Sequence, residues 1–197
     1  MRTLLLTGFE PFLDVQLNPS GEVALQLDGV RLQDSRGVAL EVRGRVLPVA
    51  FERAPGELES ALRGLGEGVA AIVSLGVHRG PAFRLEERAR AVFHSDQPDN
   101  DGRVGGGVRL EGPAERRTSL DLDRCELWLR AAGAGKVTRS DDAGGYLCER
   151  IYRAGLDEAS RLDLPALFLH VPPAERMGVE AQAGVVRGFL DALAREL

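Results

Sequence analysis

The sequence predicts an α/β fold, a three-layer α/β/α sandwich with a mostly parallel central sheet, and three observations support this. Two short apolar runs, at residues 4–7 and 69–75, look like strands buried on both faces, which is typical of parallel sheets. Segments with helical spacing alternate with strand-like segments along the chain. The length of 197 residues suits one ordinary domain, so we expect a single domain over residues 1–197.

The first half of the chain contains clear signals for element ends. Asn18 and Pro19 start a helix well, because Asn caps helices and Pro suits the first helical position. Pro55 should delay or kink the second helix. The buried strand at residues 69–75 ends at Gly76. The elements expected around these signals are a loop at residues 8–14, a helix from residue 19 to about residue 28, a strand at 41–49 and a helix at 51–65.

The second half begins less regularly and ends in well-defined elements. The pattern predicts a strand at 85–93, a turn at 97–102, a loop at 105–107, a helix at 122–132, a strand at 136–139, a helix from Cys148 to about 161, a strand at 166–171 and a helix at 179–197. The C-terminal helix is amphipathic, and its apolar residues can serve the core or a subunit interface: Val185, Val186, Phe189, Leu190 and Leu193.

Composition excludes several classes of function. The net charge is −5 at pH 7 and the basic residues are scattered, which argues against a nucleic-acid or anionic-membrane partner. The longest apolar stretches are far shorter than the ~20 residues that a bilayer span needs. Two cysteines make no disulfide framework, and the apolar N-terminus is too short for a signal peptide. We therefore expect a cytoplasmic protein.

Cys148 and His170 are the residues that indicate chemistry. Cys148 follows a glycine pair at an expected helix start, where the backbone dipole favours the nucleophilic thiolate. His170 lies in the strand at 166–171 and can supply a base. Glycine-bounded strand ends at Gly8 and Gly76 precede loops, and ligands of α/β folds bind beyond such ends. Cys125, by contrast, suits a helix core; His78 and His94 lack metal-ligand spacing.

Three segments then occur in a combination that chance would rarely produce. They read LLTGFEPF with NPS at residues 5–12 and 18–20, AGGYLC at 143–148, and FLHVP at 168–172. Weaker similarities lie at 47–49, 87–88 and 98–102. Together these segments resemble the pyroglutamyl peptidase type I family, also called pyrrolidone-carboxylate peptidases, in the family's order and over nearly the whole chain.

The resemblance implies a cysteine-type omega peptidase that removes N-terminal pyroglutamate from peptides, with no metal or organic cofactor. Matched by motif, Cys148 is the expected nucleophile, His170 the general base, and Glu87 the acid that orients the imidazole. Glu86 is adjacent, and period-two alternation points Glu86 and Glu87 to opposite faces of a strand. The choice of Glu87 therefore depends on the match of Glu87-Arg88 to the family's Glu-Arg-Val-Ala segment. The substrate-binding residues expected from the resemblance are Phe9, Phe12, Tyr146 and Val77. Family members commonly form dimers or tetramers, which predicts a homodimer or homotetramer.

The chain also departs from the family pattern around the expected site. The family's turn Gly-x-Ala-Gly-Gly-Arg is replaced by one that carries His78 and Arg79, and Asp96 replaces an arginine. Three carboxylates are added near the thiol, where they would raise its pKa: Asp141, Asp142 and Glu149. An alternative hypothesis is therefore a divergent paralogue with weak or lost peptidase activity, which binds or hydrolyses another small amide or lactam.

Overall fold

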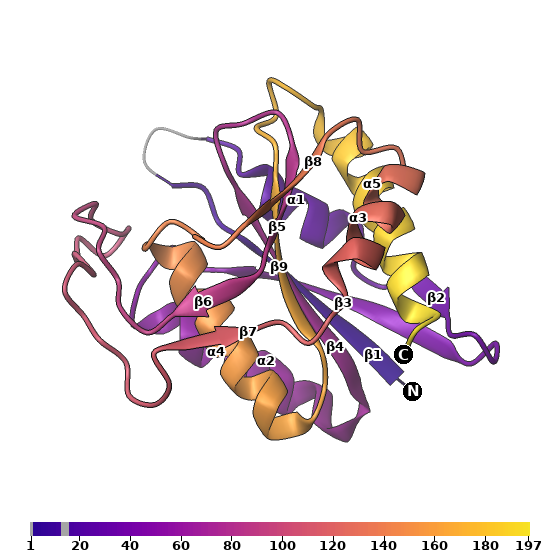
Figure 1. Cartoon of the computed structure of the whole chain (residues 1–197), viewed down its shortest axis with the longest axis horizontal. Helices are drawn as coiled ribbons and strands as arrows, with labels where there is room; N and C mark the ends of the chain where they lie inside the picture. The colour runs from indigo at the N-terminus through magenta and orange to yellow at the C-terminus, as the bar shows by residue number, and fades with distance from the viewer. Residues whose placement is uncertain (1, 13–15) are drawn as a thin grey trace.

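A seven-stranded sheet forms the centre of the computed structural model, which describes residues 2–12 and 16–197 (Figure 1). Its order is β2-β3-β1-β4-β9-β5-β8. The strands β3, β1, β4 and β9 run parallel, whereas β2 and β5 are antiparallel to β3 and β9, and β8 is parallel to β5. The bounds are Arg2–Phe9 (β1), Arg31–Gln33 (β2), Ala39–Leu47 (β3), Val69–Val77 (β4), Phe83–Glu86 (β5), Val137–Ser140 (β8) and Ala166–Val171 (β9).

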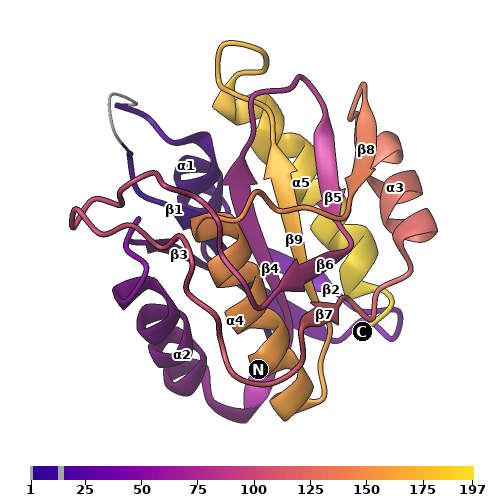
Figure 2. The ribbon, with the colours of Figure 1, turned by 60° about the vertical axis from the view of Figure 1, so that its left-hand side comes forward.

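Helices cover both faces of this sheet, which confirms the predicted three-layer sandwich (Figure 2). One face carries α2 (Arg53–Leu65) and α4 (Leu147–Leu162). The other carries α1 (Pro19–Gln26), α3 (Leu122–Ala131) and α5 (Val179–Ala194). A short 3-10 helix, η1 (Gly66–Gly68), precedes β4, and a separate two-stranded sheet pairs β6 (Arg88–Arg90) with β7 (Glu115–Arg117). None of the helices in the described ranges is long and apolar enough to cross a membrane.

The C-terminal helix serves the core of this chain. Its apolar stripe, from Val185 to Leu193, is buried against the sheet together with α1 and α3. Cys125 is fully buried in the same cluster, as the sequence predicted. Because the apolar residues of α5 are buried in the core, they are not available for a subunit interface. The homo-oligomer therefore stays a prediction.

Most expected elements lie within a few residues of their predicted bounds. Asn18 caps α1 by accepting from the Ser20 N–H, 3.2 Å away. Helix α2 begins at Arg53, two residues later than residue 51, which agrees with the expected delay. Pro55 fits there as the third helical residue, where a backbone N–H has no partner within the helix. In the expected loop at 8–14, β1 continues through Phe9, and residues 13 and 14 lie outside the described residues.

The expected strand at 85–93 is wrong as one element. The chain leaves the main sheet at Glu87, whose N–H donates to the Ser140 carbonyl and whose carbonyl accepts from the Thr118 N–H. β5 therefore ends at Glu86, and β6 pairs with β7 in the second sheet. Glu86 therefore lies within the main sheet, and Glu87 lies outside it.

Parallel β1, β4 and β9 end at one edge of the sheet, where the N-terminus of α4 also lies (Figure 2). α1 packs closely against this edge, because a Cβ on Gly8 would lie 2.0 Å from the Ser20 carbonyl oxygen. The fold thus brings the predicted Cys148 and His170 segments to the same place.

Candidate active site

Three residues form a row across the sheet beneath the start of α4. In the strand register, Gly76 of β4 pairs with His170 of β9, and His170 pairs with Arg84 of β5. Cys148, the second residue of α4, lies above this row: a Cβ built on Gly76 would be 3.0 Å from its Sγ atom. Adjacent strands are about 4.8 Å apart, so the thiol and the imidazole occupy neighbouring positions. Gly76 makes room for the thiol by having no side chain.

The imidazole of His170 is held by Glu86. His170 Nδ1 is 2.7 Å from Glu86 Oε1, and the two side chains are 3% and 0% exposed. Glu86 and His170 are on the same sheet face because Glu86 and Arg84 alternate together on β5, opposite Phe168 and His170.

The prediction of Glu87 for this position is wrong in this structure. Glu87 lies just past the end of β5, and its carboxylate pairs with Arg117 at 3.7 Å on a partly exposed surface. The match to the family motif indicated Glu87, which is one residue later in the sequence than the acid in the structure. Because side chains alternate along a strand, neighbouring residues such as Glu86 and Glu87 cannot both face the imidazole. The pattern that could have indicated Glu86 is the alternation of Arg84 and Glu86 on one face of β5, which is the face that His170 shares.

The thiol of Cys148 is half-buried and held in its neutral form. Burial raises its pKa to about 12; the charges of Glu86 and Glu149 add to the increase, and Arg84 opposes it. The predicted preference for a thiolate at the helix start is therefore outweighed by desolvation. Attack on a carbonyl then requires a base that takes the thiol proton.

His170 suits that role because it too is neutral. Burial lowers the pKa of His170, while its hydrogen bond to Glu86 raises it and Arg84 and His78 lower it. Since a carboxylate only accepts, the Glu86 contact favours a proton on Nδ1 and leaves a lone pair on Nε2. His78 stands edge-on to His170, with ring centroids 5.8 Å apart.

A cavity of about 460 Å³ opens beside Cys148. The four predicted substrate-binding residues all line it: Phe9, Phe12, Tyr146 and Val77. Tyr146 packs against Phe12 at 5.4 Å and edge-on against Phe51 at 5.1 Å between ring centroids. His78 and Arg79 line the same cavity, so the turn that departs from the family pattern forms part of its wall.

Two polar clusters that the sequence analysis missed fix these walls. Ser20 Oγ accepts from the Phe9 N–H at 3.1 Å and thereby ties the end of β1 to α1. Asp99, which is buried, accepts from the Phe51 N–H at 2.7 Å. The Asn100 side chain donates to Glu10 at 2.8 Å, and the Tyr146 hydroxyl donates to the Pro98 carbonyl at 2.9 Å. The loop at 97–103 therefore braces the aromatic side of the cavity.

The added carboxylates act differently from one another. Asp141 and Asp142 pair with Arg88 and Arg90 at 2.7 and 2.9 Å, and neither is among the main causes of the raised pKa of Cys148. Glu149 is fully buried; it accepts from the Arg90 and Gly145 N–H groups at 2.5 and 3.3 Å, joining β6 to the cysteine loop. Of the three added carboxylates, Glu149 is therefore the one that clearly raises the pKa of the thiol.

Asp96 is exposed and does not line the cavity, whereas its neighbour Gln97 does.

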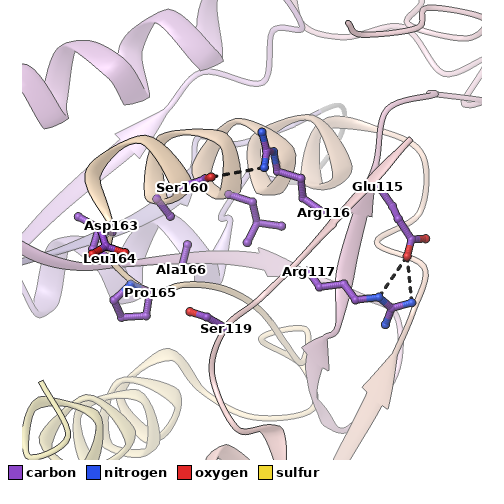
Figure 3. Close-up of a pocket in the computed structure, with 11 residues that line it drawn as sticks. Glu115, Arg116, Arg117, Ser119, Ser160, Asp163, Leu164, Pro165 and Ala166 are labelled. Atoms are coloured by element: carbon purple, nitrogen blue, oxygen red, sulfur yellow. Dashed lines mark hydrogen bonds and ion pairs between the residues drawn. The ribbon is translucent and has the colours of Figure 1, made fainter. Parts of the chain in front are cut away.

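A larger cavity, of about 650 Å³, lies at the opposite end of β9 (Figure 3). Both of its arginines are already paired: Arg116 contacts Asp157 and Ser160, and Arg117 turns towards Glu115. No cysteine or histidine is among the residues that line it. The cavity beside Cys148 is therefore the better candidate for chemistry.

Comparison with known proteins gives consistent matches. The sequence model of the pyroglutamyl peptidase family matches residues 2–186. The pyrrolidone-carboxylate peptidase of Chromobacterium violaceum is 35% identical over 174 residues, covering 87% of this chain and 78% of that protein. The corresponding protein of Pseudomonas fluorescens is 32% identical, with 87% and 79% covered.

Solved structures agree in fold. A mutant pyrrolidone carboxyl peptidase from Pyrococcus furiosus superposes with a TM-score of 0.88 at 26% identity, covering 99% of both chains. The pyrrolidone carboxyl peptidase of Fervidobacterium islandicum superposes with a TM-score of 0.85 at 27% identity, covering 98% of both.

Proposed function

The chain belongs to the pyroglutamyl peptidase family, and from this premise we propose that it removes N-terminal pyroglutamate from peptides with Cys148 as nucleophile, His170 as base and Glu86 as the orienting acid. One observation carries the assignment of roles. The thiol lies over Gly76, next to an imidazole whose Nδ1 is bound by a buried carboxylate. This is the relation of nucleophile, base and orienting group that acyl transfer requires.

The reaction begins with a neutral pair. His170 Nε2 takes the Cys148 proton as sulfur attacks the carbonyl carbon that follows the lactam, and the carbonyl oxygen becomes an oxyanion. Backbone N–H groups in the first turn of α4 can hold that oxyanion, since no side chain caps this helix. The imidazolium then gives its proton to the leaving amine, and a thioester remains on Cys148. Water, deprotonated by His170, attacks the thioester and releases pyroglutamate and the free thiol.

The cavity supports a small, flat, uncharged group at the amino end of the substrate. Phe9, Phe12 and Tyr146 give it aromatic walls, and pyroglutamate is a five-membered lactam with apolar faces and two amide-type polar groups. Arg79 and Glu175 line the same cavity and would meet the peptide beyond the scissile bond.

The test is a panel of chromogenic amides that share one leaving group: pyroglutamyl, prolyl and glutamyl. We expect release from the pyroglutamyl amide alone, and loss of at least about 10³-fold in rate for Cys148→Ser, because that change removes the nucleophilic sulfur. Cys125→Ser is the matched control, since Cys125 is buried in α3 on the other sheet face.

The outcomes separate the alternatives. Binding of free pyroglutamate without turnover would favour a pocket that has lost its chemistry. Turnover of another lactam amide, with the pyroglutamyl amide untouched, would favour a different substrate. The predictions of a single domain, a cytoplasmic compartment and a homo-oligomer stay predictions.

A further inference from the structure

Arg84 contacts both partners of the buried histidine–carboxylate pair. Its Nε donates to Glu86 Oε1 at 2.7 Å, and its Nη2 is 3.3 Å from His170 Nδ1. The same Oε1 atom is 2.7 Å from His170 Nδ1. The side chain of Arg84 is 26% exposed, so most of it is buried beside this pair.

A buried carboxylate such as Glu86 needs this cation. Its side chain is fully buried, and its Oε2 atom has no hydrogen-bond partner among the described residues. Burying a charge costs free energy unless the charge is paired and hydrogen-bonded. A neutral imidazole offers one hydrogen bond but no charge, whereas Arg84 supplies a permanent charge on the same oxygen.

The contact between Arg84 and His170 is of a different kind. When Nδ1 carries its proton, both it and Nη2 are donors, so the guanidinium does not bond the ring but disfavours a second proton on it. Other groups that face the imidazole are His78 after β4, Glu86 on β5 and Cys148 on α4. Among them Arg84 is the permanent cation.

We propose that Arg84 is a positioning residue: it holds the Glu86 carboxylate against His170 Nδ1 and disfavours a second proton on the ring, and so leaves Nε2 of a neutral His170 free to take the thiol proton. This role rests on the proposed function. It also explains why a site with a buried, neutral thiol retains a competent base. The proton taken from sulfur must be returned to the leaving amine, and a nearby cation makes the imidazolium readier to release it.

The test replaces the charge and follows the imidazole directly. The chain has three histidines, so the ring signals of His170 can be assigned in NMR spectra through His78→Gln and His94→Gln. In Arg84→Met the midpoint of the His170 titration should rise by about one pH unit, as expected when a neighbouring cation is removed. The acid limb of kcat/KM for the pyroglutamyl amide should rise with it, so that activity below the limb falls about tenfold.

Two further variants serve as comparisons for Arg84→Met. Arg84→Lys keeps the charge, so the midpoint of the His170 titration should lie close to the wild-type value. The rate should stay below that of the wild type, because an ammonium cannot contact both partners as the planar guanidinium does. Arg139→Met is the matched control: Arg139 lies on neighbouring β8, pairs with Asp123 and Glu126, and is 33% exposed. It should leave the titration and the acid limb unchanged.

An unshifted titration and acid limb in Arg84→Met would overturn the proposal, as would equal shifts in Arg139→Met. If Arg84→Met does not fold, Arg84→Gln carries the same test, since it removes the charge and keeps a donor. The NMR titration needs no turnover. A wild-type protein inactive on the pyroglutamyl amide would therefore overturn the proposed function while the role of Arg84 is still decided.

Discussion

Gly76→Ala should displace the thiol of Cys148 without replacing any of the residues proposed to react. The new methyl carbon would be 2.7 Å from the Phe168 ring and 3.0 Å from Cys148 Sγ. Ordinary contacts between such atoms begin at about 3.5 Å, so each neighbour must move by roughly half an ångström or more. Both neighbours must give: the Phe168 ring is fully buried against His170 and Tyr152, so its displacement strains the core, and the half-buried thiol is pushed from its place over Gly76.

The size of both effects follows from this geometry. Overpacking a well-packed core costs about 1–3 kcal/mol, and each kcal/mol lowers the Tm of a chain of this size by about 2–4 °C. A shift approaching 1 Å at a reacting group costs up to about 10²-fold. We therefore expect kcat/KM for the pyroglutamyl amide to fall about 10- to 100-fold, with a lower Tm in calorimetry.

Gly155→Ala is the matched control in α4. A Cβ there meets only Ile72 Cγ2, at 3.8 Å, which is an ordinary contact. Alanine is favoured over glycine within a helix by about 1 kcal/mol, so this variant should be fully active and at least as stable as the wild type. Wild-type kcat/KM in Gly76→Ala would refute the placement of the thiol over Gly76.

Three further predictions follow from the site. Glu86→Gln should lower kcat/KM at least about 10²-fold while Glu87→Gln stays within about twofold; comparable losses in both would contradict the assignment of Glu86 as the orienting acid. Because burial raises the pKa of Cys148 above its ordinary 9.0, its thiolate fraction, and so its alkylation by iodoacetamide in a Cys125→Ser background, should still rise with pH beyond that value; a plateau below pH 8 would show a depressed pKa. Asp99→Ala leaves the buried Phe51 N–H without its acceptor, so we expect a loss of about 1–3 kcal/mol in unfolding free energy and a raised KM; an unchanged KM would show that the loop does not brace the cavity.

The sheet and its helices were predictable because local signals there agree with the final packing. The runs around Leu4 and Ile72 are apolar without alternation, as strands covered on both faces must be. Asn18 and Pro19 fix the start of α1 through contacts within a few residues. The meeting of Cys148 with His170 also followed, since parallel strand ends converge at one edge of the sheet.

The acid of the site could not be taken from the motif alone. Glu86 and Glu87 are neighbours of the same type, and their difference arises where the chain leaves the main sheet, which depends on pairing with Ser140 and Thr118 far along the sequence. Arg84 was missed for the same reason. Its partners come from β9 and from its own strand only after β5 pairs antiparallel to β9, a direction that no local pattern encodes.

The state of the thiol was misjudged because a helix start is a local feature and burial is not. The dipole at the N-terminus of α4 favours a thiolate, but the packing of Cys148 over Gly76 removes the thiol from water and dominates its pKa. The helix dipole can be anticipated from the residues around Cys148, whereas its burial depends on the packing of β4 and β9.

The most direct measurement is to find where the acyl group goes. A pyroglutamyl ester with a good leaving group is mixed with the protein, quenched in acid during the first turnovers, digested and analysed by mass spectrometry. The account predicts a pyroglutamyl thioester on the peptide that contains Cys148, and its disappearance in Cys148→Ser together with turnover. Acylation of another residue, or undiminished hydrolysis by Cys148→Ser, would contradict it.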